Sequence, residues 1–248
     1  MTMLDRAATA PGLRLGAVAL ASAGLLFAAF PLIRPFFANL PPAIASSAVP
    51  IAADAATLTN AAEALMSPAW VVSHLLAAAA LVLLPLGALA LSLAIEGSGQ
   101  RAMAATVLTF IGSGLLLVVI GGEAFGLPAA AQAYATGESV DLVALVNRVR
   151  NPALFATLLL GLVGLAAGGI TLAAAIWRSG LPRAAAVLLA FGLVLWMPLL
   201  PQVPRIIDGL VIGVGSCWLA AALWRRETAD TFASTARGQS TTSFGKAG

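Results

Sequence analysis

Residues 69–95 of the chain read AWVVSHLLAAAALVLLPLGALALSLAI, without one Asp, Glu, Lys or Arg. A helix needs about 20 apolar residues to cross the roughly 30 Å hydrocarbon layer of a bilayer, and this run exceeds that length. In lipid every backbone N–H and C=O must be satisfied by the protein itself, which leaves helices and closed barrels. The run lacks the apolar–polar alternation of a barrel strand, so it predicts a transmembrane helix.

Similar runs elsewhere in the chain predict an all-α fold, a polytopic transmembrane bundle of six helices. Hydrophobic residues are 60% of the 248 and charged residues 9%, which leaves no stretch long enough for a separate soluble domain. The predicted spans are Leu13–Ile33, Ala69–Ile95, Met103–Leu127, Pro152–Trp177, Ala184–Val203 and Ile206–Trp224. The transmembrane domain thus covers residues 1–226. Residues 227–248, rich in Ser, Thr, Ala and Gly, are predicted to form a disordered tail.

The 13 basic residues divide unequally between the two sides that six spans would create. Nine of the 13 fall on the side of both termini: Arg6, Arg14, Arg101, Arg178, Arg183, Arg225, Arg226, Arg237 and Lys246. The other four are Arg34, Arg148, Arg150 and Arg205. Because cytoplasmic segments carry the excess of Lys and Arg, we predict that both termini and the tail are cytoplasmic. The two longer loops are then extracytoplasmic.

Each of these two longer loops contains a segment with helical periodicity. Asp54–Met66 places its apolar residues on one face, and Asp54 is positioned to cap its start. Val140–Arg150 has a similar apolar stripe, and Ser139 is positioned to cap it. We expect two short amphipathic helices lying on the outer face of the bundle, with plain loops as the alternative.

Local signals agree with the predicted ends of the spans. Ser67-Pro68 and Asn151-Pro152 each place a capping residue before a proline at the first helical position. Trp70 and most of the other tryptophans lie near span ends, as in an aromatic belt. Pro85 and Pro198 interrupt the second and fifth spans and predict bends there.

Ionisable side chains within the spans are costly in lipid, so each one requires a reason. His74, Glu123 and Asp208 are the clear cases, and all three fall within roughly 10 Å of the predicted outer surface at a rise of 1.5 Å per residue. A polar pocket open to the outside is one interpretation. Its candidate residues are His74, Glu123, Arg205, Asp208, Arg150 and Asn151, with Arg205 and Asp208 three positions apart and able to pair. The alternative is that these charges reach the interface and pair for stability.

No catalytic or cofactor motif accompanies these residues. One His and two carboxylates are too few for the usual zinc sites, and one His gives a single axial haem ligand, so we expect neither metal nor cofactor. Ser73 adjoins His74, but neighbours on a helix diverge by about 100°, so the two are not a catalytic dyad. Cys217 has no partner for a disulfide. We therefore expect a protein without catalytic activity.

Glycine pairs at helical spacing mark helix faces that permit close backbone approach, either within the bundle or toward other membrane subunits or a second copy. They are Gly122 with Gly126, Gly164 with Gly168, and Gly209 with Gly213. Membrane lipid is the other expected partner. The net charge of +3 is not arranged as a basic stripe with interleaved aromatic residues, so nucleic acid is not expected.

The layout of the chain resembles that of uncharacterised bacterial multi-span membrane proteins. The resemblance lies in a long first outer loop, a His early in the second span (Val71-Val72-Ser73-His74-Leu75-Leu76) and Gly121-Gly122-Glu123 in the third. It implies a bacterial plasma membrane as the location and no particular activity.

The sequence leaves two main functions open. The chain is expected to be a binding protein or an accessory subunit that holds a lipid, a quinone or a partner helix near its extracytoplasmic half. The alternative is a transporter of a small solute, and a membrane-embedded enzyme is a third interpretation. Transport sites commonly lie near the midplane. The candidate residues here lie above it, which favours binding.

Overall fold

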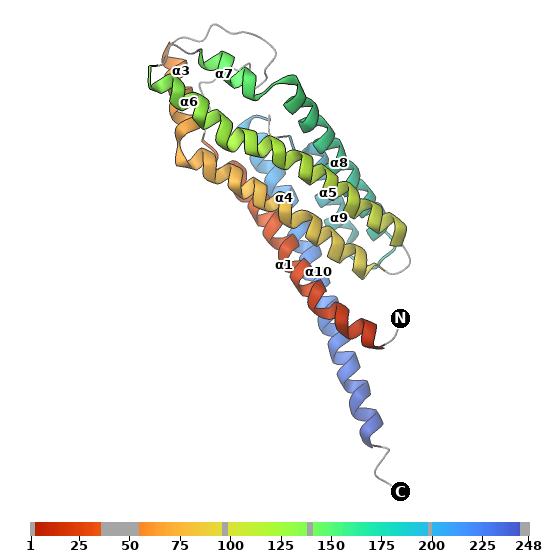
Figure 1. Ribbon diagram of the computed structural model, residues 1–248. Helices are drawn as coiled ribbons and strands as arrows, with labels where there is room; N and C mark the ends of the chain where they lie inside the picture. Colours follow the sequence, from red (N-terminus) through yellow and green to blue (C-terminus); the bar gives the residue numbers. More distant parts are fainter. Residues whose placement is uncertain (1–2, 36–54, 96–98, 138–140, 198–199, 244–248) are drawn as a thin grey trace.

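The computed structural model describes residues 3–35, 55–95, 99–137, 141–197 and 200–243, and every regular element in these ranges is a helix. Figure 1 shows an elongated helical bundle. The helices are α1 (Met3–Ile33), α3 (Ala55–Met66), α4 (Pro68–Ala94), α5 (Gly99–Gly121), the π-helical turn η1 (Gly122–Gly126), α6 (Leu127–Ala135), α7 (Leu142–Val149), α8 (Pro152–Ile176), α9 (Arg183–Leu195) and α10 (Gln202–Ser243).

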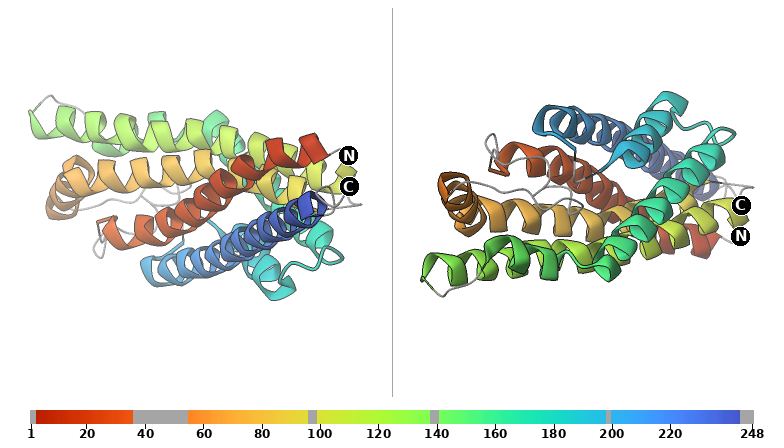
Figure 2. Two further views of the ribbon diagram at one scale, coloured as in Figure 1. Left: turned by 90° about the horizontal axis from the view of Figure 1, so that it is seen from below. Right: turned by 90° about the horizontal axis from the view of Figure 1, so that it is seen from above.

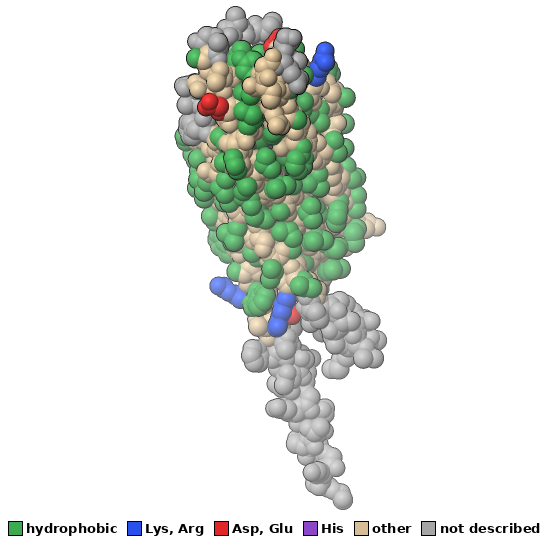
Figure 3. Space-filling view, turned by 60° about the vertical axis from the view of Figure 1, so that its left-hand side comes forward, with side chains coloured by type: hydrophobic (Ala, Val, Ile, Leu, Met, Phe, Trp, Pro, Cys, Tyr) green, Lys and Arg blue, Asp and Glu red, His purple; other side chains and the backbone are tan. Residues whose placement is uncertain are grey.

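Five helical segments are long and apolar enough to cross a membrane, so the chain is a multi-pass membrane protein. They are Gly12–Ile33, Pro68–Ala94, Gly99–Ala135, Pro152–Ile176 and Gln202–Thr228. Large apolar side chains such as Leu160 and Val163 are exposed on the sides of the bundle, where lipid would solvate them. Figure 3 shows apolar side chains over the middle of one face and charged ones near its two ends.

The fifth predicted span, Ala184–Val203, is corrected by the structure. α9 has 13 residues, and at 1.5 Å per residue it is about 20 Å long, short of the roughly 30 Å hydrocarbon layer. The chain leaves the helix at Trp196, whose backbone is extended (φ −62°, ψ 100°). Prolines follow at positions 198 and 201, and a proline disfavours helical geometry in the residue before it. Pro198 itself lies outside the described residues, whereas Pro85 lies inside the continuous helix α4.

The last helix extends well beyond its predicted span, Ile206–Trp224. α10 begins at Gln202 and ends at Ser243, so it continues through most of the segment predicted to be disordered. Residues 225–237 contain neither Gly nor Pro. Adding a residue to an existing helix costs far less than starting one, because each added residue gains a hydrogen bond.

Six of the described helices pack in a ring, in the order α1, α4, α5, α8, α9, α10 and back to α1. Figures 1 and 2 show both chain ends at one end of this bundle, which we call the terminal end. The short helices α3, α6 and α7 lie at the other end, which we call the cap end. At the terminal end, Arg14 pairs with Glu227 (Nε–Oε1 2.9 Å), and Arg226 donates to the carbonyls of Ala94 and Ser179. These contacts connect α1, α4 and α10 to each other and to the turn that follows α8.

Glycines explain the close packing of α5 against α8. A Cβ added at Gly112 would lie 2.5 Å from the backbone nitrogen of Leu165, and one at Gly168 would lie 2.5 Å from Oγ1 of Thr109. Gly164 and Gly168, one of the three predicted glycine pairs, therefore face α5. Gly209 and Gly213 face α1, and Gly122 and Gly126 face the side chains of Leu154 and Val149. All three pairs thus contact helices of the same chain.

A separate apolar cluster holds the cap end together. It combines residues of α3, α4, α6 and α7: Ala61, Ala62, Leu65, Trp70, Leu127, Ala131, Leu142 and Val146. The segments predicted as short helices, Asp54–Met66 and Val140–Arg150, contain α3 and α7. The cap of α7 is Asp141, which accepts a hydrogen bond from the N–H of Val143 (2.9 Å). Asp54 and Ser139, the predicted caps, lie outside the described residues.

Candidate functional site

Glu123 lies in a π-helical turn, the single departure from α geometry in the otherwise continuous rod from Gly99 to Ala135. Such turns insert an extra residue into the helix and often occur at functional sites. The indole N–H of Trp70 donates to the backbone carbonyl of Glu123 (2.8 Å). A side chain of α4 therefore supports the carbonyl of the distorted turn.

The carboxylate of Glu123 is held by Arg150 in a two-pronged ion pair. Nε of Arg150 lies 2.7 Å from Oε1, and Nη2 lies 2.8 Å from Oε2. Both side chains are mostly buried, with 12% of Glu123 and 14% of Arg150 exposed. Arg150 occupies the C-terminal end of α7, where its backbone N–H donates to the carbonyl of Val146. The pair thus fixes α7 to the turn in the α5–α6 rod.

His74 packs beside this ion pair, and a hydrogen bond to the backbone of its own helix determines which ring nitrogen carries the hydrogen. Its Nδ1 lies 2.8 Å from the carbonyl of Trp70, so Nδ1 carries the hydrogen and donates it. The other ring nitrogen, Nε2, faces Oε2 of Glu123 at 4.0 Å. The imidazole contacts two aromatic rings, with centroids 4.4 Å from Trp70 and 5.8 Å from Phe30. Ser73 also donates to the carbonyl of Trp70 (2.8 Å), and its Oγ lies 3.4 Å from Nδ1 of His74.

Arg34, which follows the end of α1, contacts Glu123 and Trp70 as well. Its Nη2 lies 4.0 Å from Oε2 of Glu123, and its guanidinium carbon lies 4.6 Å from the ring centroid of Trp70, a cation–π contact. Burial and, to a smaller extent, the charge of Arg205 lower the pKa of Arg34 to about 9, while the charge of Glu123 opposes this shift. The side chain therefore stays protonated at neutral pH. We call Arg34, Trp70, His74, Glu123 and Arg150 the Glu123 network.

Arg205 lies near this network but makes its own contacts. Its guanidinium donates to the side chain of Gln202 (3.4 Å) and to the carbonyl of Leu200, and no described residue accepts a hydrogen bond from its buried Nε. Gln202 in turn donates to the carbonyl of Pro31, which joins α10 to the end of α1.

The predicted pairing of Arg205 with Asp208 is wrong. Within the part of the chain that the structure describes, neither oxygen of Asp208 has a hydrogen-bond partner, although the residue is only 6% exposed. Arg205 instead reaches back toward the start of α10, while Asp208 packs toward the interior of the bundle. The structure therefore places Asp208 apart from the Glu123 network, with no bond joining them.

Of the six predicted site residues, His74, Glu123 and Arg150 meet directly, and Arg205 is an electrostatic neighbour. Asn151 has a local role: its side chain accepts from the N–H of Leu154 (2.9 Å) and caps α8, as the Asn-Pro pattern predicts. Trp70, which its position near a span end places in the aromatic belt, is instead fully buried and central to the site. Its spacing of four residues from His74 on one helix is the sequence signal that could have indicated this role.

Metal ligands do not gather at this site. Within the described ranges, no three His, Cys, Asp or Glu side chains come together. Cys217 is partly buried, with its Sγ 3.9 Å from the carbonyl of Ala21. The Glu123 network consists of charge pairs and hydrogen bonds between guanidinium groups and the carboxylate of Glu123.

Comparison with known proteins gives no family assignment: no protein family, curated protein or solved structure matches this chain.

Proposed function

We propose that the chain is a non-catalytic integral membrane protein that binds the anionic head group of a membrane lipid at its cap end. The observation that carries the proposal is the charge balance there. Arg150 and Arg34 lie 2.7 and 4.0 Å from the carboxylate of Glu123, and a third arginine, Arg205, interacts with Glu123 through its charge. Guanidinium groups bind phosphate in a two-pronged geometry, and buried N–H groups gain most from an acceptor.

Arg205 is the arginine best suited to contact such a ligand. Arg150 is paired with Glu123, whereas the buried Nε of Arg205 has no acceptor among the described residues. A buried donor without an acceptor costs roughly 1–3 kcal/mol, so a phosphate oxygen there would recover that energy. The apolar sides of the bundle would accommodate the acyl chains.

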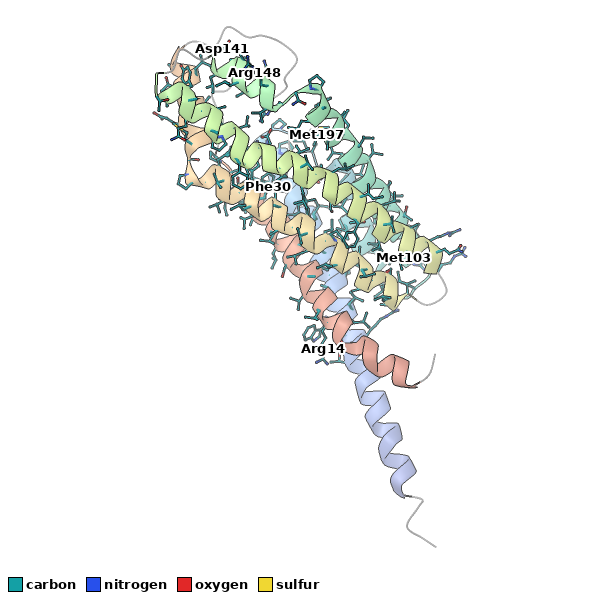
Figure 4. The ribbon with its side chains drawn as sticks, in the orientation of Figure 1. Arg14, Phe30, Met103, Asp141, Arg148 and Met197 are labelled. Carbon is teal, nitrogen blue, oxygen red and sulfur yellow. The ribbon has the colours of Figure 1, made fainter. Side chains whose placement is uncertain are left out.

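Lipid retention by the purified protein tests this proposal. Native mass spectrometry would compare added phosphatidylglycerol, which is anionic, with phosphatidylethanolamine, which is zwitterionic. We expect Arg205→Gln to weaken retention of phosphatidylglycerol at least tenfold, because a hydrogen bond to a charged group contributes about 1.5–3 kcal/mol. Arg148→Gln is the matched control. Arg148 is exposed on α7, as Figure 4 shows at the cap end, and its loss should leave retention unchanged.

Equal retention of both lipids, or equal effects of both substitutions, would contradict the proposal. A quinone co-purifying in place of a phospholipid would favour the other amphipathic ligand that the sequence leaves open. A protein subunit co-purifying in fixed ratio would favour the accessory-subunit role.

A transporter of a small solute is the second candidate, and the shortness of α9 favours it. Helices that stop part-way through the membrane are a common feature of transport sites, since their ends and the following backbone meet the substrate. α9 ends after about 20 Å, and the backbone of the next residue is extended. Uptake by reconstituted vesicles would separate transport from binding.

We further propose that the protein lies in a bacterial plasma membrane with both termini in the cytoplasm and its cap end outside. The support is the nine-to-four division of the 13 basic residues between the two sides. Reporter fusions after Glu96 and after Trp224 should report a cytoplasmic position, and one after Asn60 an external position. A cytoplasmic reading at Asn60 would exclude this topology.

A further inference from the structure

Asp208 is a buried acid that the Glu123 network does not use. It is 6% exposed, and neither carboxylate oxygen has a hydrogen-bond partner among the described residues. An ionised carboxylate isolated in an apolar interior is strongly destabilising, so the group must either take up a proton or meet another cation. The groups packed around Asp208 decide between these two outcomes.

The packing of α9 against α10 places Asp208 at the truncated end of α9. The two helices are antiparallel, and a Cβ on Gly192 would lie 3.2 Å from the nitrogen of Ile212, while one on Gly215 would lie 2.6 Å from the nitrogen of Leu189. Both contacts share one register. One helical turn from these contacts, and on the same faces of the two helices, this antiparallel alignment places Asp208 of α10 opposite Trp196. Trp196 is the residue at which α9 ends.

The end of α9 adds negative charge to this position. The last carbonyls of a helix have no N–H partner within the helix, and together they carry a partial negative charge. Because α9 has only 13 residues, this charge lies part-way along the bundle, beside the buried side chain of Trp196. A carboxylate and a helix C-terminus at the same level repel each other unless a cation lies between them.

The described charged groups on the surrounding helices are engaged elsewhere. On α10, Arg205 donates to Gln202 and to the carbonyl of Leu200. Arg34, after the end of α1, lies over Trp70, and His74 on α4 donates to the carbonyl of that residue. From Ala184 to its end, α9 carries no ionisable side chain.

We propose that Asp208 and the C-terminal turn of α9 form a binding site for one hard monovalent cation, a proton or Na⁺. The donor set consists of oxygen atoms, which hard cations prefer, and a single carboxylate balances a single positive charge. The C-terminal ends of interrupted helices, together with unwound backbone carbonyls, also coordinate Na⁺ or H⁺ in transporters. The site is separate from the lipid site proposed above and does not depend on it.

Infrared spectroscopy of the whole protein in lipid nanodiscs tests this inference. A protonated carboxyl group has a C=O stretch distinct from that of a carboxylate, and the difference between wild type and Asp208→Asn isolates the signal of Asp208. At pH 7 with choline as the salt cation, we expect Asp208 to be protonated. Adding NaCl should abolish the signal if Na⁺ replaces the proton, and leave it unchanged if the site takes the proton alone.

An ionised Asp208 in choline that does not respond to NaCl would overturn the inference, because another partner would then neutralise it. Labelling wild-type protein with carboxyl-¹³C aspartate gives the same readout without a substitution, which covers the case that Asp208→Asn does not fold. Glu123→Gln is the matched control. Glu123 is already paired with Arg150, so its replacement should remove no protonated-carboxyl signal. Phosphatidylglycerol retention by Asp208→Asn should equal that of wild type, which separates this site from the lipid site.

Discussion

Replacing Glu123 by Gln keeps the shape of the side chain and removes the charge at the centre of the network. The substitution leaves Arg150 and Arg34 without their carboxylate, and the new amide group faces a guanidinium nitrogen 2.7 or 2.8 Å away. Removing one partner of a buried ion pair costs about 3–5 kcal/mol. Since 12% of Glu123 and 14% of Arg150 remain exposed, water offsets part of this loss, and we expect about 3 kcal/mol.

Reversible unfolding in mixed detergent micelles measures this loss as a change in the free energy of unfolding. A loss of about 3 kcal/mol lowers the folding equilibrium constant roughly 100-fold. Glu63→Gln is the matched control, since it makes the same chemical change at an exposed position of α3, and it should cost less than about 0.5 kcal/mol. Equal effects of the two substitutions would refute the view that Glu123 holds the cap end together.

A double-mutant cycle with Arg150→Gln distinguishes the ion pair from other effects of the substitution. If the pair is direct, Glu123→Gln combined with Arg150→Gln should cost less than the sum of the two single changes, by about 0.5–3 kcal/mol. Strict additivity would mean that the two side chains do not interact in the membrane.

Two further predictions concern packing and use the same unfolding assay. Gly112→Ala should destabilise the protein by about 1–3 kcal/mol, because the added Cβ would lie 2.5 Å from a backbone nitrogen of α8; Gly114→Ala, where nothing lies within 4 Å, should be neutral or stabilising, and the reverse order would contradict the α5–α8 packing. Trp70→Phe should cost about 1 kcal/mol or more, because it removes the indole N–H that donates to the carbonyl of Glu123; an unchanged stability would mean that the π-helical turn does not need this bond.

The helical class of the fold could be predicted because it depends on composition and run length alone. The boundaries of α9 and α10 could not. An apolar run such as Ala184–Val203 satisfies a hydropathy criterion whether or not its backbone is helical throughout, and here prolines at 198 and 201 outweigh it. The predicted tail shows the converse. Its composition favours disorder, yet a helix already formed up to Trp224 continues through it.

The sequence could predict how deep in the membrane the site residues lie, but not which side chains they contact. Counting residues along each span places His74, Glu123 and Asp208 at one level, yet depth does not specify which way a side chain points around its helix. The pairing with Arg150 depends on the fold of α7 against the α5–α6 rod, and the role of Trp70 depends on a π-helical turn. No local sequence rule predicts either of these features.

The two buried acids Glu123 and Asp208 illustrate why the direction in which a side chain points matters more than its depth in the membrane. Glu123 faces Arg150, Arg34 and His74, so its charge is balanced within the chain and its removal should be costly. Neither oxygen of Asp208 accepts a hydrogen bond from the residues that the structure describes, and in the inference above its charge is balanced by a cation from solution. A charged residue whose partners belong to the same chain stabilises the fold. A residue whose partner must arrive from solution responds to the concentration of that partner. A fixed ion pair at Glu123 and an exchangeable site at Asp208 should therefore respond differently to substitution: Glu123→Gln should lower stability in every salt, whereas Asp208→Asn should abolish any dependence of stability on Na⁺ or pH that arises at α9.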